Sequence, residues 1–299
     1  MIGLKNIIIS PTLLKNLSSI DEFKGLWRGL DQHTTGLQLL GDVADYGAHF
    51  KQVLGPLEAE DISPAMVRAL HASLHKQKGK SDFRAQDIEI DFKDGDVLIG
   101  RLSAAPPEQI PAFLDKLCGW VNKALAEKEH HPLITAGVFT AVFLQVAPFE
   151  TGNQGLARFL LLLILLKSGY TYAPYVSLEP LMEQRAEALY QALKANQESL
   201  EGARPDWGGW LEAFTDVLAA QCAVLYERLY AKEADLSNLP ALSARIMALF
   251  KEHKRLQMSE LVKLTRGRRA TLKIRLNELI EAGYLHRHGQ ARSTWYSLV

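Results

Sequence analysis

The residues whose types and spacing could do chemistry lie between positions 147 and 158, in the stretch APFETGNQGLAR. Gly152 and Asn153 stand before an intensely apolar run, and Arg158 follows within the first turns of the expected helix. The first amides of a helix are free and positively polarised, so such a start can bind an anion. Glycine allows close approach of the backbone, and an arginine can bind a phosphate through two N–H groups. A simple helix cap accounts for the same residues, and both interpretations stay open.

The elements that must position this stretch are predicted to be mainly helical. Helical spacing runs through residues 11–77 and resumes after the Pro-Pro break in AAPP. We expect further helices over residues 132–146, from the motif to about 167, from about 179 to 199 and from 207 to about 232. Period-two alternation between Asp82 and Leu102 predicts one β-hairpin that turns around Asp94-Gly95.

The chain from Ala241 onward differs from the rest in charge. It holds twelve Lys and Arg against four Asp and Glu, whereas the remainder holds 22 against 30. Helical patterns at Leu242–His253, Ser259–Leu264 and Arg268–Ala282 precede two short strands around Gly289-Gln290, which is the order of a winged helix-turn-helix. The stretch ADLSNLP, just before this region, predicts a linker.

The basic side chains of this region suggest a partner. The candidates for contacting DNA phosphates lie at the start of the third helix and on or beside the wing: Arg268, Arg269, Lys273, Arg287 and Arg292. The same surface could be an ordinary solvated face, or could bind a protein. We favour DNA because the excess charge is concentrated at the helix start and the wing.

Length and composition set further limits. A chain of 299 residues with 47% hydrophobic residues predicts two globular domains. The two cysteines show no metal-binding spacing, which fits free thiols in a reducing cytoplasm. The longest apolar run, Leu156 to Leu166, has about half the length that a membrane span needs. We therefore expect a cytoplasmic protein that does not bind a membrane.

The motif resembles the signature of the Fic (filamentation induced by cAMP)/Doc family, His-Pro-Phe-x-Asp/Glu-Gly-Asn-Gly-Arg-x-x-Arg. The matching residues share its spacing without a gap: Pro148, Phe149, Gly152, Asn153 and Arg158. Similar stretches extend over nearly the whole chain. The resemblance implies a mainly α fold, a Fic-type helical bundle with a β-hairpin flap and a C-terminal winged helix-turn-helix. The expected parts are an N-terminal helical region (1–77), a Fic core with the flap (78–235) and the winged helix-turn-helix (240–299).

The resemblance also implies a reaction, the transfer of AMP from ATP to a Ser, Thr or Tyr hydroxyl of a target protein that pairs with the flap. In the family the histidine is the general base, the acidic residue holds Mg²⁺, and the Gly-Asn-Gly amides and two arginines bind the phosphates. Here Ala147 occupies the base position and Thr151 the metal-carboxylate position. Gln154 replaces the second glycine and Gly155 the first arginine.

These departures predict a catalytically impaired Fic-fold protein with a regulatory role. We expect no catalytic residue and no metal ligand in the motif, and the loss of the carboxylate argues against Mg²⁺. Arg158 could bind a ligand phosphate or be a structural residue, and His130 and His131 lie too far along the preceding helix to replace the base. The alternative is an active protein adenylyltransferase, and association into homo-oligomers stays open. A residual pocket for ATP or another nucleotide would be formed by Gly152, Asn153, Gln154, Gly155 and Arg158.

Overall fold

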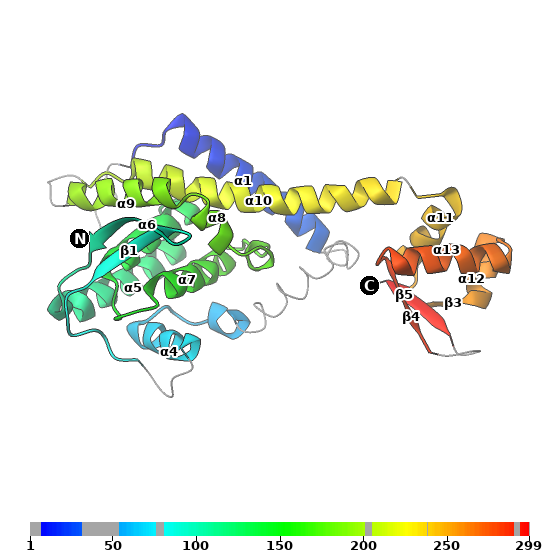
Figure 1. Ribbon diagram of the computed structural model, residues 1–299, viewed down its shortest axis with the longest axis horizontal. Coiled ribbons are helices and arrows are strands. Elements are labelled where there is room, and N and C mark those ends of the chain that lie inside the picture. The colour runs from blue at the N-terminus through cyan, green and yellow to red at the C-terminus, as the bar shows by residue number, and fades with distance from the viewer. Residues whose placement is uncertain are drawn as a thin grey trace. The chain divides into compact units, whose positions relative to one another are not determined.

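The computed structural model describes residues 7–31, 54–75, 81–200, 205–237, 239–289 and 294–298. Helices dominate it, as the sequence predicted (Figure 1). The chain divides into two compact units, Met1–Gly25 with Gly47–Ala223, and Leu26–Tyr46 with Val224–Val299. The division expected at 77/78 and 235/240 stays a prediction. No helix within the described ranges is long and apolar enough to cross a membrane.

The first unit is built around one central helix, α6 (Pro132–Val146), which is buried on almost every side. A helix that is apolar all round needs partners all round. Helix α5 (Ile110–Glu127) and helix α7 (Asn153–Lys167) pack against it. On another side, Trp210 donates a hydrogen bond from its indole nitrogen to the carbonyl of Gly137, at 2.7 Å. A Cβ at Gly137 would lie only 2.8 Å from Leu211, so this glycine allows the close approach.

One of the predicted helices is divided. The single helix expected over 179–199 is two helices, α8 (Glu179–Glu183) and α9 (Ala186–Leu200). Arg185 lies in the break and forms an ion pair with Asp216, at 2.6 Å. The other elements before the basic region are α1 (Pro11–Asp31), α4 (Pro64–Leu74), α10 (Gly208–Ser237) and the short 3-10 helices η1 (Pro107–Gln109) and η2 (Ala173–Tyr175).

Helix α10 corrects the expected linker. It continues to Ser237, through most of the stretch ADLSNLP. Good helix formers precede Ser237, and Pro240 is the first residue whose ring excludes a helix interior. The helix therefore ends later than the polar residues of this stretch suggested.

The predicted hairpin consists of β1 (Glu89–Asp94) and β2 (Val97–Ser103), which pair antiparallel from Glu89↔Ser103 to Asp94↔Val97. Its two-residue turn is Gly95-Asp96, one residue later than expected, because Gly95 supplies the positive φ of 57°. A bulge lies between Phe92 and Lys93. The hairpin packs on α9, where a Cβ at Gly100 would lie 2.2 Å from the Tyr190 ring.

The second unit contains the basic end of the chain. Its sheet has the order β3-β5-β4 with antiparallel pairing, and β3 is a short strand that the sequence did not predict. Leu261, Leu272, Leu276 and Leu285 belong to one buried core that joins helices and strands. The elements follow in the order α11 (Ala241–Glu252), β3 (Leu256–Gln257), α12 (Met258–Thr265), α13 (Arg269–Glu281), β4 (Leu285–His288) and β5 (Trp295–Leu298).

Candidate functional site

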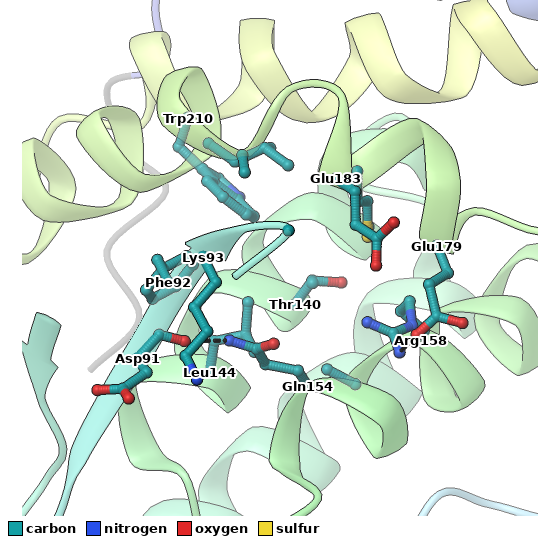
Figure 2. Close-up of a pocket in the computed structure, with 15 residues that line it drawn as sticks. Asp91, Phe92, Lys93, Thr140, Leu144, Gln154, Arg158, Glu179, Glu183 and Trp210 are labelled. Atoms are coloured by element: carbon teal, nitrogen blue, oxygen red, sulfur yellow. Dashed lines mark hydrogen bonds and ion pairs between the residues drawn. The ribbon is translucent and has the colours of Figure 1, made fainter. Parts of the chain in front are cut away.

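A pocket of about 320 Å³ opens beside the first turns of α7 (Figure 2). Its walls come from the hairpin, α6, α7, α8, α9 and the first turn of α10. Of the five residues predicted to bind a nucleotide, Gln154 and Arg158 line the pocket, whereas Gly152, Asn153 and Gly155 do not. The apolar part of the lining consists of Phe92, Leu144, Ala157, Met182, Ala186, Leu189 and Trp210.

The loop that leads into α7 is held by a buried arginine. Ala147, which the resemblance places at the position of the base, is 0% exposed and ends α6 in the left-handed conformation, with a φ of 41°. Arg84 donates from Nε to the Ala147 carbonyl at 2.8 Å and from Nη2 to the Val146 carbonyl at 3.1 Å. Its backbone N–H donates to the Pro148 carbonyl at 3.0 Å. Arg84 therefore satisfies the free carbonyls at the end of α6, where the helix dipole favours a cation.

A histidine from α4 also holds this loop. The ring of His71 stacks on Phe149 with 3.8 Å between centroids. Its Nε2 lies 2.9 Å from the Thr151 carbonyl, and because a carbonyl only accepts, Nε2 carries the proton. Its Nδ1 lies 2.7 Å from the Ser81 hydroxyl. Burial lowers the pKa of His71, and the nearby His75 lowers it further, so the neutral ring is favoured.

Nothing in the sequence connected His71 with the motif. His71 and His75 are visible at helical spacing in ISPAMVRALHASLH, but the spacing does not say what the helix packs on. The histidines that the sequence placed nearest to the motif along the preceding helix were His130 and His131. Nε2 of His131 lies 2.9 Å from a carboxylate oxygen of Asp21, at the start of α6 and away from the motif.

Gly152 and Asn153 form the turn itself. Gly152 has a φ of 78°, and a Cβ there would lie 2.0 Å from Nε2 of His75. Asn153 is buried, accepts a hydrogen bond from the Phe149 N–H at 3.0 Å and donates one to the Phe149 carbonyl at 2.7 Å. The side-chain amide of Asn153, a residue predicted to bind a nucleotide, is thus engaged inside the loop. Gly152 is thus both the turn residue and the N-cap of α7, and the side chain of Asn153 closes the turn through its hydrogen bonds to Phe149.

The next two positions of the motif face the hairpin and open space. Gln154 donates from Nε2 to the Asp91 carbonyl of β1 at 2.9 Å, which ties α7 to the hairpin. A Cβ at Gly155 would meet no described atom within 4 Å. The space beside Gly155, where the resemblance places the first arginine, is therefore open.

Arg158 is the remaining cation of the motif, and it forms an ion pair with Glu179 at the start of α8. This pair is the structural contact that was one of the two roles open for Arg158, and the binding of a ligand phosphate by Arg158 stays a prediction. Figure 2 shows the two side chains meeting at one edge of the pocket. A polyphosphate would gain little binding energy from Arg158 while Glu179 is paired with it, because the carboxylate offsets the charge of the guanidinium. The charged part of the lining holds two cations, Lys93 and Arg158, and three carboxylates, Asp91, Glu179 and Glu183.

The residues present do not fit a Mg²⁺ ion held as the resemblance implies. Thr151 offers an exposed, neutral hydroxyl, and its carbonyl is bonded to His71. Glu150, one position earlier, is exposed. Within the described part of the chain, no three His, Cys, Asp or Glu side chains gather as metal ligands. A hard divalent cation needs several oxygen ligands, usually including carboxylates.

The residues predicted to contact DNA belong to the second unit. Arg268 precedes α13 as its N-cap residue, and Arg269 and Lys273 are exposed on its first turns. Arg287 is exposed on β4, whereas Arg292 lies outside the described residues. A ring contact also joins β4 to β5, because His288 stacks on Trp295 with 3.9 Å between ring centroids.

Comparisons with known proteins identify the domain that carries the motif. Residues 61–165 match the model of the Fic/DOC family. The chain is similar to the structure of a Fic family protein from Desulfovibrio desulfuricans G20, with a TM-score of 0.54 and 15% identity, over 98% of this chain and 97% of that one. It is also similar to a Fic domain-containing signaling protein from Bacteroides thetaiotaomicron VPI-5482, with a TM-score of 0.42 and 15% identity, over 74% and 92%. No match was found among curated proteins.

Proposed function

Because residues 61–165 form a Fic/DOC domain, we propose that the protein is a regulatory relative of the AMP-transferring enzymes. In this proposal it has lost transfer by a general base and a metal, keeps a pocket for a nucleotide or another phosphate compound, and binds DNA through its second unit. Ala147 carries the proposal. It is a fully buried methyl group at the position where the reaction needs a proton acceptor.

The neighbouring groups support the loss of the base. A general base must reach the proton of the attacking hydroxyl within hydrogen-bond distance. The Nε2 proton of His71 is donated to the Thr151 carbonyl and its ring is packed on Phe149, so this imidazole is a support of the loop. Neither His71 nor the adjacent His75 lines the pocket. The hairpin lines the pocket, as a flap that binds a target protein would, and this fits the alternative of an active enzyme.

The pocket supports binding of a small molecule with one anionic end. Trp210, Leu144 and Leu189 offer an apolar surface that suits a nucleobase. At the other end, a phosphate could reach the guanidinium of Arg158 once Glu179 is displaced. ATP or another nucleotide would then be a regulatory ligand, bound without transfer of its AMP.

The second unit supports binding to DNA. Its order of helices and strands fits a winged helix-turn-helix, in which α12 and α13 would be the two helices of the motif. The exposed cations at the start of α13 would contact phosphates while α13 lies in the major groove. The positive balance of the chain from Ala241 onward supplies the long-range attraction.

An assay of AMP transfer tests the first part. The full chain is incubated with ATP labelled on the α-phosphate, Mg²⁺ or Mn²⁺, and a bacterial lysate, and we expect no label that survives denaturation. Arg158→Ala and Lys194→Ala are run beside it, since both remove one cation of the first unit but only Arg158 lines the pocket. Label that survives denaturation in the wild type and in Lys194→Ala, and vanishes in Arg158→Ala, would establish the active enzyme instead. Calorimetry with ATP and ADP then measures binding without transfer.

A salt titration tests the second part. The full chain is titrated with random-sequence duplex DNA at several salt concentrations, together with the double variant Arg268→Ala/Arg269→Ala. Loss of two phosphate contacts should lower the slope of log affinity against log salt by about 1.8. The control is Lys116→Ala/Lys194→Ala, which removes the same charge from exposed positions of the first unit. Equal affinity of the two double variants would remove Arg268 and Arg269 from the proposed contacts, and no binding by any protein would remove DNA binding from the proposal.

A further inference from the structure

The exposed side of α13 carries an aliphatic side chain at its centre. Ile274 is 59% exposed, whereas Leu272, Leu276 and Leu279 of the same helix are buried in the core of the second unit. At 3.6 residues per turn, Ile274 lies on the side of the helix opposite to these leucines. Its side chain therefore contributes nothing to the core and is presented to whatever approaches α13.

The neighbours of Ile274 on this side are small or polar. Ala270 and Thr271 lie one turn before it, and Asn277 and Glu278 lie one turn after it; all four are exposed. Ile274 stays 59% exposed among these neighbours, so a partner can reach it. Ala270, Ile274 and Asn277 form a strip along α13, which we call the reading strip.

Positive charge flanks the N-terminal half of the reading strip. Arg269 and Lys273 are exposed beside it, and Arg268 lies directly before the helix. Of the acidic residues of α13, Glu281 lies at its other end, and Glu278, one turn after Ile274, is bonded to Arg275 at 2.7 Å. A partner that meets the N-terminal half of this face thus meets cations beside a narrow apolar surface, and at the other half it meets an amide beside a carboxylate that is paired with Arg275. Double-stranded DNA fits this distribution, because its phosphates border a groove of base edges.

We propose that the reading strip recognises A·T base pairs in the major groove, an inference that rests on the proposed binding of DNA. Ile274 contacts the 5-methyl group of a thymine, which is the apolar group that the major groove displays. Asn277 binds an adenine through its amide, with N6–H₂ as the donor and N7 as the acceptor on the base. Arg268, Arg269 and Lys273 contact phosphates and fix the register of the helix.

Base analogues test both contacts. The full chain first selects sites from duplexes with a randomised centre, and we expect sites that contain A·T pairs at fixed positions. Each thymine is then replaced by deoxyuracil, which lacks the methyl group, and each adenine by 7-deazaadenine, which lacks N7. At one thymine the wild type should lose about fourfold in affinity, the value of one buried methyl group. At one adenine it should lose roughly tenfold.

The variants identify the side chains. Ile274→Ala should bind the selected site about fourfold more weakly than the wild type and should no longer distinguish thymine from deoxyuracil. Asn277→Ala should no longer distinguish adenine from 7-deazaadenine. Leu264→Ala is the matched control, because Leu264 is 40% exposed on α12, outside the reading strip, and the variant should keep both discriminations.

Four outcomes would overturn the inference or its premise. Binding that responds to salt but selects no A·T pair refutes base recognition by the strip and leaves the proposed DNA binding intact. Loss of affinity with deoxyuracil that is equal in wild type and Ile274→Ala refutes the contact made by Ile274. Self-association that Ile274→Ala abolishes, with unchanged selection of DNA, assigns the strip to a second copy of the chain. No binding to any duplex removes the premise as well.

Discussion

The close approach of the hairpin to α9 can be tested at Gly100. The hairpin forms one wall of the pocket, and it lies on α9 because Gly100 has no side chain where the Tyr190 ring passes. Gly100 is not among the glycines with a positive φ, so alanine would be acceptable to the backbone. We expect Gly100→Ala to destabilise the hairpin solely through the contact with Tyr190.

The magnitude follows from the geometry. The new Cβ would lie 2.2 Å from Cζ of Tyr190, whereas ordinary contacts are 3.4–4 Å. The ring has little freedom to move away, because it is 7% exposed and lies against Phe92 with 5.4 Å between centroids. Such overpacking costs about 1–3 kcal/mol. Alanine also restricts the unfolded chain, which offsets about 0.4–1 kcal/mol, so a net loss of about 1–2 kcal/mol is expected.

The assay is a double-mutant cycle read by hydrogen exchange. The amides of β1 and β2 report the free energy of opening the hairpin in wild type, Gly100→Ala, Tyr190→Ala and the double variant. In the Tyr190→Ala background, Gly100→Ala should cost nothing, because the obstacle is gone. Gly119→Ala is the matched control, since Gly119 lies in α5 and a Cβ there would meet nothing within 4 Å. It should stabilise its helix by about 0.5–1 kcal/mol.

Two results would refute this reasoning. If Gly100→Ala costs the same with and without the Tyr190 ring, the ring is not the obstacle. If Gly100→Ala leaves the exchange of β1 and β2 unchanged in the wild type, the hairpin does not depend on this approach.

Three further predictions concern the site. Glu179→Gln should free Arg158 and raise the affinity for ADP severalfold in calorimetry, since a partly exposed ion pair contributes about 0.2–1 kcal/mol and the repelling carboxylate is removed as well. His71→Gln should flatten the dependence of stability on pH. Because the pKa of His71 is lowered in the folded protein, the unfolded chain takes up the proton at a higher pH than the folded chain does. Urea unfolding of the wild type should therefore show that the stabilisation is present above pH 6.5, the ordinary pKa of histidine, and is lost as the pH falls below it. Arg84→Lys should destabilise the first unit by about 2–3 kcal/mol in urea unfolding, because lysine cannot replace the forked hydrogen bonds to the loop carbonyls.

Each of these has a control on the same chain. Glu198→Gln removes a carboxylate from α9 outside the pocket lining and should leave ADP affinity unchanged; an equal gain in both variants would point to net charge alone. His130→Gln should keep the pH dependence that His71→Gln loses, and a parallel loss would exclude His71 as the source. Arg101→Lys changes an exposed arginine of β2 and should leave the urea midpoint unchanged. An equally small effect of Arg84→Lys would show that the hydrogen bonds of Arg84 to the loop are unimportant.

The sequence alone was sufficient for α7 and for the hairpin. The apolar run after Asn153 defined α7, and the alternation around Gly95 defined the hairpin to within one residue of its turn. Such patterns arise from neighbours three, four or two positions apart, which one segment contains in full. The prediction that Ala147 stands at the position of the base also came from spacing, because the motif is continuous in the chain.

What the chemical groups of the motif do was decided by tertiary contacts. Arg84 and His71 reach the loop from segments about sixty to eighty residues earlier, and Glu179 reaches Arg158 from the following helix. The Asn153 side chain closes its own loop, a contact that the sequence did not predict, and the binding of a phosphate at Asn153 stays a prediction. Periodicity shows which side of a helix is apolar, but it does not show which distant side chain will supply the hydrogen bonds of a buried loop. Those partners are fixed only when the helices pack, since the desolvated carbonyls and charges must then be paired within the fold.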